Sequence, residues 1–383
     1  MKKILNSLLI KPSGPDCNLD CVYCFYLDKA EYFSENKIHR MSLKVLEELV
    51  KQAFQNSPQH VSFGWQGGEP TLMGLSFFRK AVEFQEKYGE GKVVGNGLQT
   101  NGILINQEWA NFLTKYNFLV GLSLDGPEHI HDHYRFNKNG KGTWNKVHNA
   151  AKLLLDLGVA TNALVVVNDY SVKYPEEIYN YHKELGLNYM QFIPCVETDL
   201  SANDKASAYS VKDEEYGEFL KKIFDLWYAD IKDGIASTSV RYFDSVFYNY
   251  VGLDAPECTL AQVCGSYLVV EHNGDVFSCD FFVENDWKLG NVLTHRMDEM
   301  LNSQVQEKFG LMKANLPAEC ETCQWLKKCW GGCTKDRIRD PQDKGSNHFC
   351  VSYKMFFEHA DKKLTELADQ WKENQANENY FRS

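Results

Sequence analysis

Short apolar segments rich in β-branched residues alternate with amphipathic helical segments over residues 4–195, and this alternation constrains the fold more than any other feature. Six segments are predicted to be strands: 6–12, 61–67, 93–102, 118–126, 160–168 and 188–195. Helical patterns lie between them, at 42–55, 74–88, 107–116 and 143–158. Strand, helix and strand at this spacing are typical of a parallel sheet covered by helices. The sequence therefore predicts an α/β fold, a partial (β/α)6 TIM-like barrel.

The character of the chain changes near residue 235, where periodic segments become fewer and cysteines more frequent. Residues 267–283 form two apolar runs separated by Asn273-Gly274, which is a strong signal for a β-hairpin turn. An amphipathic helix is predicted over 353–371. We therefore predict two domains, residues 1–235 and a cysteine-rich domain over 236–383.

Three cysteines, Cys17, Cys21 and Cys24, lie within eight residues just after the first predicted strand. Structural zinc is almost always bound by four ligands, and no fourth cysteine or histidine is near in sequence. An iron–sulfur cluster held by three thiolates leaves one iron open for another ligand. The spacing favours a cluster, and a zinc site or three inert thiols remain the alternatives.

Residues suited to ligand binding follow the other strands, where a β/α barrel carries its functional groups. Gly67 and Gly68 allow close backbone approach, and Glu69 offers a carboxylate to a cation. An ordinary strand-to-helix turn beginning at Pro70 explains the same residues equally well. Residues 129–134, with three histidines, are predicted to form a loop.

The net charge of −11 argues against nucleic acid or an anionic membrane as a partner, because both favour basic surfaces. No apolar run reaches the ~18 residues that a membrane span needs. The first twelve residues resemble a strand more than a secretion signal. Twelve cysteines in a chain of this kind indicate metal binding in a reducing compartment, so we expect a cytoplasmic protein.

The Cys17–Cys24 motif and the Gly67–Pro70 motif resemble those of the radical S-adenosylmethionine (AdoMet) superfamily. The resemblance implies a [4Fe-4S] cluster on Cys17, Cys21 and Cys24, whose open iron binds AdoMet, and a 5′-deoxyadenosyl radical as the reactive species. By the same resemblance, AdoMet is contacted by residues of the barrel: Tyr23, Gly67, Gly68, Glu69, Ser123, Arg135 and Val196.

The eight cysteines from Cys258 to Cys350 could form zinc ribbons or iron–sulfur sites by spacing alone. Their pattern resembles the SPASM domain of peptide-modifying radical AdoMet enzymes, which carries two auxiliary [4Fe-4S] clusters. The resemblance implies four ligands for auxiliary cluster I: Cys258, Cys264, Cys279 and Cys333. It implies four more for auxiliary cluster II: Cys320, Cys323, Cys329 and Cys350. With no open iron, these clusters fit electron transfer.

Several segments resemble the anaerobic sulfatase-maturating enzymes: 21–26, 63–71, 98–102, 241–244 and 279–283. The resemblance implies oxidation of a Cys or Ser in a sulfatase C/S-x-P-x-R motif to Cα-formylglycine. It implies Asp280 as the base, and we expect Tyr26 and Gln66 to position the target residue. The partners implied are an unfolded or nascent sulfatase and an electron donor such as flavodoxin or ferredoxin.

Two other functions fit parts of the sequence. One is a different SPASM-type maturase that forms thioether or carbon–carbon crosslinks. The other, of a different class, is a zinc-ribbon binding protein without catalysis. Asp280 beside Cys279, with the 241–244 segment upstream, favours sulfatase maturation.

Overall fold

The computed structural model describes residues 2–26, 29–34, 37–57, 59–232 and 234–382. The chain divides into two compact units. Unit 1 comprises residues 1–124, 134–162 and 264–311, and unit 2 comprises 125–133, 163–263 and 312–383. Within the described part of the chain, every helix is too short or too polar to cross a membrane.

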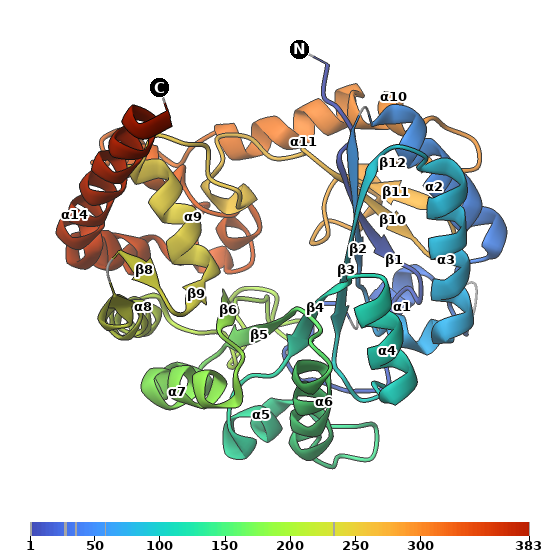
Figure 1. Cartoon of the computed structure of the whole chain (residues 1–383), viewed down its shortest axis with the longest axis horizontal. Helices are drawn as coiled ribbons and strands as arrows, with labels where there is room; N and C mark the ends of the chain where they lie inside the picture. The colour runs from blue at the N-terminus through green and yellow to red at the C-terminus, as the bar shows by residue number, and fades with distance from the viewer. Residues whose placement is uncertain (1, 27–28, 35–36, 58, 233, 383) are drawn as a thin grey trace. The chain divides into compact units, whose positions relative to one another are not determined.

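Unit 1 is a sheet with helices packed along it (Figure 1). Its strands are β1 (Ser7–Lys11), β2 (His60–Trp65), β3 (Val93–Thr100), β4 (Leu119–Ser123), β10 (Leu268–Glu271), β11 (Asp275–Phe277) and β12 (Lys288–Asn291), in the order β12-β11-β10-β1-β2-β3-β4. Five neighbouring strands, β10, β1, β2, β3 and β4, run parallel to one another. The pairs β10–β11 and β11–β12 are antiparallel. The predicted hairpin is confirmed, because Gly274 makes the β10–β11 turn at φ +89°.

The helices of unit 1 are α1 (Lys29–Tyr32), α2 (Leu43–Asn56), α3 (Gly74–Tyr88), α4 (Gln107–Lys115), α6 (Trp144–Asp156) and α10 (Met297–Leu301). The predicted helical segments correspond to α2, α3, α4 and α6, whereas α1 and α10 were not predicted. Helix α2 begins at Leu43 because the Ser42 side chain caps its first turn: Ser42 Oγ accepts a hydrogen bond from the Val45 amide at 3.3 Å. Its apolar residues recur every three or four positions and are buried, with Leu46 and Leu49 fully inaccessible.

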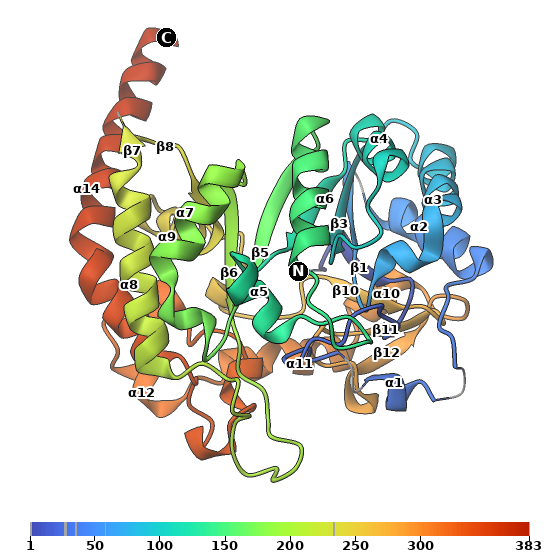
Figure 2. The same ribbon diagram turned by 90° about the horizontal axis from the view of Figure 1, so that it is seen from below.

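Figure 2 shows the β10–β11–β12 segment beside β1 in unit 1. β10 pairs with β1 in parallel register, so that Leu8 faces Leu268 and Lys11 faces Glu271. The second neighbour of the first strand therefore comes from a segment some 260 positions later in the chain. Both Lys11 and Glu271 are fully buried at the carboxyl end of their strands.

Unit 2 contains the parallel strands β5 (Thr161–Val167), β6 (Tyr189–Pro194) and β9 (Ser239–Val240). The first two residues of β5 are assigned to unit 1, which ends there at residue 162. A small hairpin in unit 2 is formed by β7 (Ile231–Lys232) and β8 (Ile235–Ala236). Its helices are α5 (Glu128–Tyr134), α7 (Pro175–Leu185), α8 (Asp213–Ala229), α9 (Arg241–Tyr250), α12 (Ala318–Glu321), α13 (Leu326–Cys329) and α14 (Cys350–Arg382). A further helix, α11 (Gln304–Ala314), includes residues of both units.

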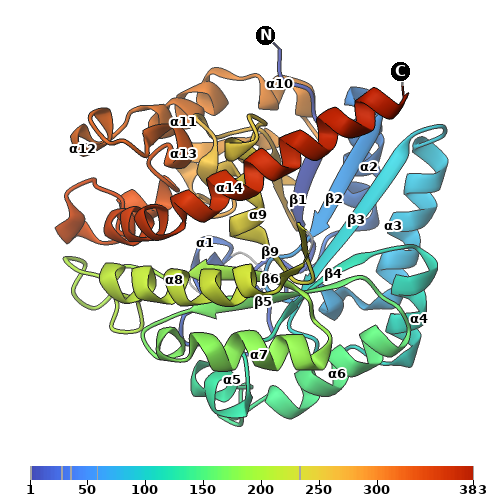
Figure 3. The same ribbon diagram turned by 60° about the vertical axis from the view of Figure 1, so that its left-hand side comes forward.

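In unit 2, α8 and α14 run side by side (Figure 3). An aromatic core joins them to α9, in which Phe243 stacks on Phe356 at 5.2 Å between ring centroids and Phe224 meets both rings edge-on. The loop predicted over 129–134 is wrong, because these residues lie in α5.

The predicted α/β class is confirmed: in each unit parallel strands alternate with helices along the chain, and a cysteine-rich segment with a hairpin and a C-terminal helix follows. The predicted domain boundary between residues 235 and 236 stays a prediction. The contact-based units do not coincide with it, since β10–β12 complete the sheet of unit 1.

Candidate active site

The loop with Cys17, Cys21 and Cys24 begins directly after β1 in unit 1. The loop begins with a turn in which the Gly14 amide donates to the Lys11 carbonyl at 3.1 Å. A second turn lies at its end, where the Cys24 amide donates to the Cys21 carbonyl at 3.1 Å. Burial raises the pKa of the Cys17 thiol to about 11. The loop places three thiols on one short segment at the carboxyl end of the sheet, as the sequence predicts.

Gly67 and Gly68 pack against this cysteine loop. The Gly68 amide donates to the Gly14 carbonyl at 2.8 Å, and a Cβ on Gly68 would lie 2.1 Å from the Asp16 carbonyl oxygen. Gly67 has φ +114°. The chain's own backbone therefore requires glycine at both positions, and their contact with a cofactor stays a prediction.

Glu69 is completely buried between β2 and β3. Its Oε1 accepts from the Thr71 amide at 3.0 Å and from the hydroxyls of Thr71 and Thr100, while its Oε2 accepts from the Asn101 amide at 2.8 Å. Burial raises the pKa of Glu69, and these donors act in the opposite direction. Among the residues that the structure describes, Oε2 has the Asn101 amide as its one donor and can accept a further hydrogen bond, which suits a ligand ammonium group.

Arg135 and Tyr23, two predicted AdoMet contacts 112 positions apart, form a hydrogen bond of 2.8 Å from Arg135 Nη1 to the Tyr23 hydroxyl. Backbone hydrogen bonds hold the two segments together, from the Val22 amide to the Tyr134 carbonyl at 3.0 Å and from the Asp20 amide to the Phe136 carbonyl at 2.8 Å. The cysteine loop and the segment after α5 therefore form one wall of the candidate site in unit 1.

Asp280 and Tyr26 belong to a second cluster in unit 1, together with two charged residues that the sequence analysis did not select. The Asp280 carboxylate forms an ion pair with Lys11 Nζ. The Tyr26 hydroxyl donates to Glu271, and Lys11 Nζ lies 3.4 Å from the centroid of the Tyr26 ring. Burial and the nearby Glu271 carboxylate raise the pKa of Tyr26, so that its phenol remains a donor at neutral pH.

The remaining predicted contacts lie at strand ends. Gln66 follows β2 and is largely buried, and Ser123 ends β4; both belong to unit 1. Val196 is fully buried after β6 in unit 2. These positions agree with the predicted carboxyl-end location, and the ligand contacts themselves stay predictions.

The chemistry of the cysteine loop fits an iron–sulfur cluster with AdoMet. None of the twelve cysteines, all of which lie in the described part of the chain, takes part in a disulfide. The buried Ser13 Oγ and Asn18 Nδ2, which flank Cys17 in sequence, have no hydrogen-bond partner among the residues that the structure describes. Buried polar atoms normally have partners, so a polar cofactor beside this loop is consistent with both.

Four cysteines of unit 2 line one cavity, and they are the four predicted ligands of auxiliary cluster II: Cys320, Cys323, Cys329 and Cys350. The cavity wall also includes Trp325 and Phe357. Burial raises the pKa of the Cys329 thiol to about 11. Four converging thiols in a largely apolar cavity fit a four-iron cluster with no open iron.

The four predicted ligands of auxiliary cluster I are divided equally between the units. In unit 2, the Lys313 ammonium donates to the carbonyls of Thr259 and Gly332, which follow Cys258 and precede Cys333. In unit 1, the Tyr267 hydroxyl lies 3.5 Å from Cys279 Sγ, and the Cys264 amide donates to the Gly310 carbonyl. The assignment of these four thiols to one cluster stays a prediction.

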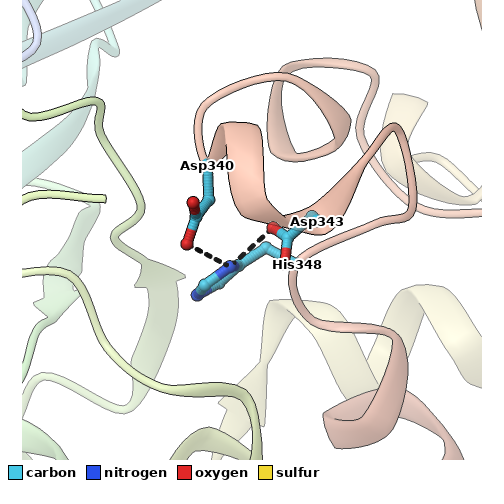
Figure 4. A group of neighbouring side chains, drawn as sticks. All are labelled: Asp340, Asp343 and His348. Carbon is cyan, nitrogen blue, oxygen red and sulfur yellow. Dashed lines mark hydrogen bonds and ion pairs between the residues drawn. The ribbon is translucent and has the colours of Figure 1, made fainter. Parts of the chain in front are cut away.

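Figure 4 shows a second group of potential metal ligands, Asp340, Asp343 and His348 in unit 2. His348 Nδ1 lies 2.8 Å from Asp343 Oδ2 and 3.8 Å from Asp340 Oδ2, while Nε2 lies 3.1 Å from the Val211 carbonyl. Both ring nitrogens thus have partners in the chain, and ion pairing explains the group without a metal.

Lys11 and Glu271 are functional candidates that the sequence analysis missed. A signal was available, because each is a charged residue that directly follows an apolar strand run, Leu8–Ile10 or Leu268–Val270. Charged side chains are rarely fully buried unless they are paired. The sequence alone does not show that these two strands are neighbours.

Comparison with known proteins identifies the class. Residues 12–182 match the model of the radical SAM superfamily, and residues 258–324 match an iron–sulfur cluster-binding domain. The chain is 41% identical to the serine-type anaerobic sulfatase-maturating enzyme of Bacteroides thetaiotaomicron, over 92% of this chain and 88% of that protein. The chain therefore belongs to the family of anaerobic sulfatase-maturating enzymes.

Two further similarities agree. The cysteine-type anaerobic sulfatase-maturating enzyme of Clostridium novyi is 38% identical over 94% of this chain and 97% of that protein. The solved structure of native anSMEcpe with bound AdoMet and the Cp18Cys peptide matches with a TM-score of 0.87 at 38% identity, over 95% of this chain and 98% of that one.

Proposed function

We propose that this chain is a radical AdoMet oxidoreductase that converts a Cys or Ser in a sulfatase C/S-x-P-x-R motif to Cα-formylglycine. The observation that carries the proposal is the similarity to sulfatase-maturating enzymes over nearly the whole chain, at 38–41% identity. The substrate is a sulfatase polypeptide. The cytoplasm is the proposed location, because a reducing compartment keeps the thiols free for iron.

The AdoMet site is proposed to comprise Glu69 for the ammonium group, with Arg135, Tyr23, Ser123, Gly67, Gly68 and Val196 as further contacts. When bound, AdoMet and the cluster on Cys17, Cys21 and Cys24 supply a 5′-deoxyadenosyl radical that removes a hydrogen atom from the substrate Cβ. Glu69 is held by its four donors in one orientation, so it binds without rearranging.

Asp280 is proposed to accept the proton of the substrate thiol or hydroxyl. Its carboxylate is paired with Lys11 and its side chain is 15% exposed, so it is partly screened from water and still accessible. Tyr26, whose hydroxyl donates a hydrogen bond to Glu271, and Gln66 are the proposed positioning residues for the target side chain. An electron donor of the flavodoxin or ferredoxin type is proposed as the redox partner.

The number of clusters is open to direct measurement. Three [4Fe-4S] clusters correspond to about twelve irons per chain after anaerobic reconstitution. Cys329→Ala removes one thiol of the cavity in unit 2 and is expected to lower the content by about four irons, because three thiols with an apolar wall hold the auxiliary cluster poorly. Cys195→Ala, which alters a buried cysteine outside the predicted ligand sets, is the control. Equal iron in parent and Cys329→Ala would contradict the assignment.

The central test incubates reduced, reconstituted protein with AdoMet and peptides containing C-x-P-x-R or S-x-P-x-R. We expect 5′-deoxyadenosine and a peptide mass corresponding to the aldehyde, from at least one of the two peptides. AdoMet cleavage with neither peptide oxidised would instead favour another SPASM-type maturase. Zinc in place of iron, with no absorbance near 400 nm, would indicate a zinc-ribbon protein.

A further inference from the structure

Two charged residues meet at one point of the sheet of unit 1, although they are 260 positions apart. In the parallel pairing of β1 with β10, Lys11 is the register partner of Glu271. Register partners on neighbouring strands project from the same face of a sheet. Both residues are 0% exposed, which is costly for a charge without partners.

Two of the contacts of the Lys11 ammonium are with the residues that the proposed function uses, and a third is with the Phe25 ring at 5.8 Å. Its ammonium forms an ion pair with Asp280, and it lies 3.4 Å from the centroid of the Tyr26 ring, in cation–π geometry. Its stem is confined by Gly67, where a Cβ would come within 3.0 Å of the Lys11 Cβ. The methylene groups of Lys11 are therefore packed against Gly67, and its ammonium group contacts both Asp280 and Tyr26.

Glu271 fixes the opposite end of Tyr26 by accepting the hydrogen bond of its hydroxyl. The His272 ring lies beside Glu271, with 3.7 Å between its Nδ1 and Glu271 Oε2, which is beyond hydrogen-bond distance. The His272 ring packs against Phe33 and His39, with centroid distances of 5.0 and 4.8 Å. Tyr26 is thus restrained at its ring face by a cation and at its hydroxyl by a carboxylate.

We propose that Lys11 and Glu271 are positioning residues, which set the Asp280 carboxylate and the Tyr26 ring in one fixed arrangement around the target side chain. The inference rests on the proposed function and deepens it. Neither residue needs to touch the substrate. Burial alone would also be expected of an ion pair that only stabilises the fold. The positioning role is favoured because Lys11 contacts both Asp280 and Tyr26, the residues proposed to act on the substrate.

The test is a double-mutant cycle on the reconstituted holoenzyme. Lys11→Met keeps the length of the stem and removes the charge; we expect kcat to fall about 100-fold with KM changed by less than about threefold, because misplacement by about 1 Å has that effect on kcat. Combined with Asp280→Asn, Lys11→Met should add no further loss, since it acts through Asp280. Lys11→Arg should recover part of the rate.

Two measurements distinguish positioning from unfolding. Peptide affinity by fluorescence anisotropy should stay near the parent value in Lys11→Met. Lys288→Met, which removes the more exposed lysine paired with Asp275 at 2.8 Å in the same sheet, is the control for loss of a lysine–aspartate pair and should retain the parent kcat. Glu271→Val, which removes the acceptor of Tyr26, should lower kcat, and adding it to Tyr26→Phe should lower kcat no further.

The outcomes separate the two proposals. A parent protein that converts neither peptide overturns the proposed function together with this role. A parent that converts a peptide, with losses from Lys11→Met and Asp280→Asn that multiply in the double variant, overturns the positioning role alone. A parent-like kcat in Lys11→Met would also overturn the positioning role alone.

Discussion

Asp280→Asn is expected to lower formylglycine formation about 1,000-fold, which lies within the usual range for loss of a general base. Asparagine has the shape of aspartate but cannot take up the substrate proton at neutral pH. The measurement is the initial rate of peptide oxidation by mass spectrometry, with 5′-deoxyadenosine and iron content recorded in parallel. We expect AdoMet cleavage and iron to remain at parent levels, so that cleavage becomes uncoupled from oxidation.

The matched control for this change is Asp275→Asn. Asp275 also pairs with a lysine, Lys288, and its side chain is 12% exposed against 15% for Asp280. Asp275 lies in β11 and is not part of the candidate site, so its variant should keep the parent rate. An Asp280→Asn protein as active as the parent would remove Asp280 from the mechanism.

Glu69→Gln is expected to weaken AdoMet binding about 1,000-fold, which corresponds to about 4 kcal/mol for a buried charge left without its partner. In the parent, the Asn101 amide donates to Glu69 Oε2 at 2.8 Å. In the variant, the glutamine oxygen can still accept from Thr71 and Thr100, but the glutamine NH2 group then faces the Asn101 amide. Two donors in contact should also lower the free energy of unfolding by about 1–3 kcal/mol.

Equilibrium dialysis with AdoMet measures the affinity, and chemical denaturation measures the stability. Glu47→Gln is the control, because Glu47 also accepts hydrogen bonds, from Lys87 at 2.8 Å and Tyr88 at 2.7 Å, but on the surface. It should bind AdoMet as the parent does. Parent-like AdoMet affinity in Glu69→Gln would mean that Glu69 serves the fold and not the cofactor.

Local pattern was sufficient to predict most elements of the α/β fold. The apolar period over 74–88 coincides with α3 (Gly74–Tyr88), and the Asn273-Gly274 pair coincides with the β10–β11 turn. α5 was missed because its seven residues, with three histidines, are too few and too polar to show a helical period. Periodicity is informative only where one face is buried over several turns.

The candidate site was predictable only in part. Its cysteine pattern and Glu69 are contiguous motifs, and a contiguous motif can be read from one sequence. Lys11 and Glu271 become neighbours through strand pairing between distant segments, which no local pattern specifies. The reason for Gly68 also differs from the expected one, because the Asp16 carbonyl occupies the space that a side chain would need.

The position of β1 between β2 and β10 has a consequence for how the protein is made. β1 is complete within the first residues to leave the ribosome, yet one of its edges stays unpaired until more than 250 further residues have been synthesised. Such non-local pairing slows folding, and an open strand edge invites association with other chains. A nascent chain of this protein is therefore most at risk of aggregation while β10 is still missing.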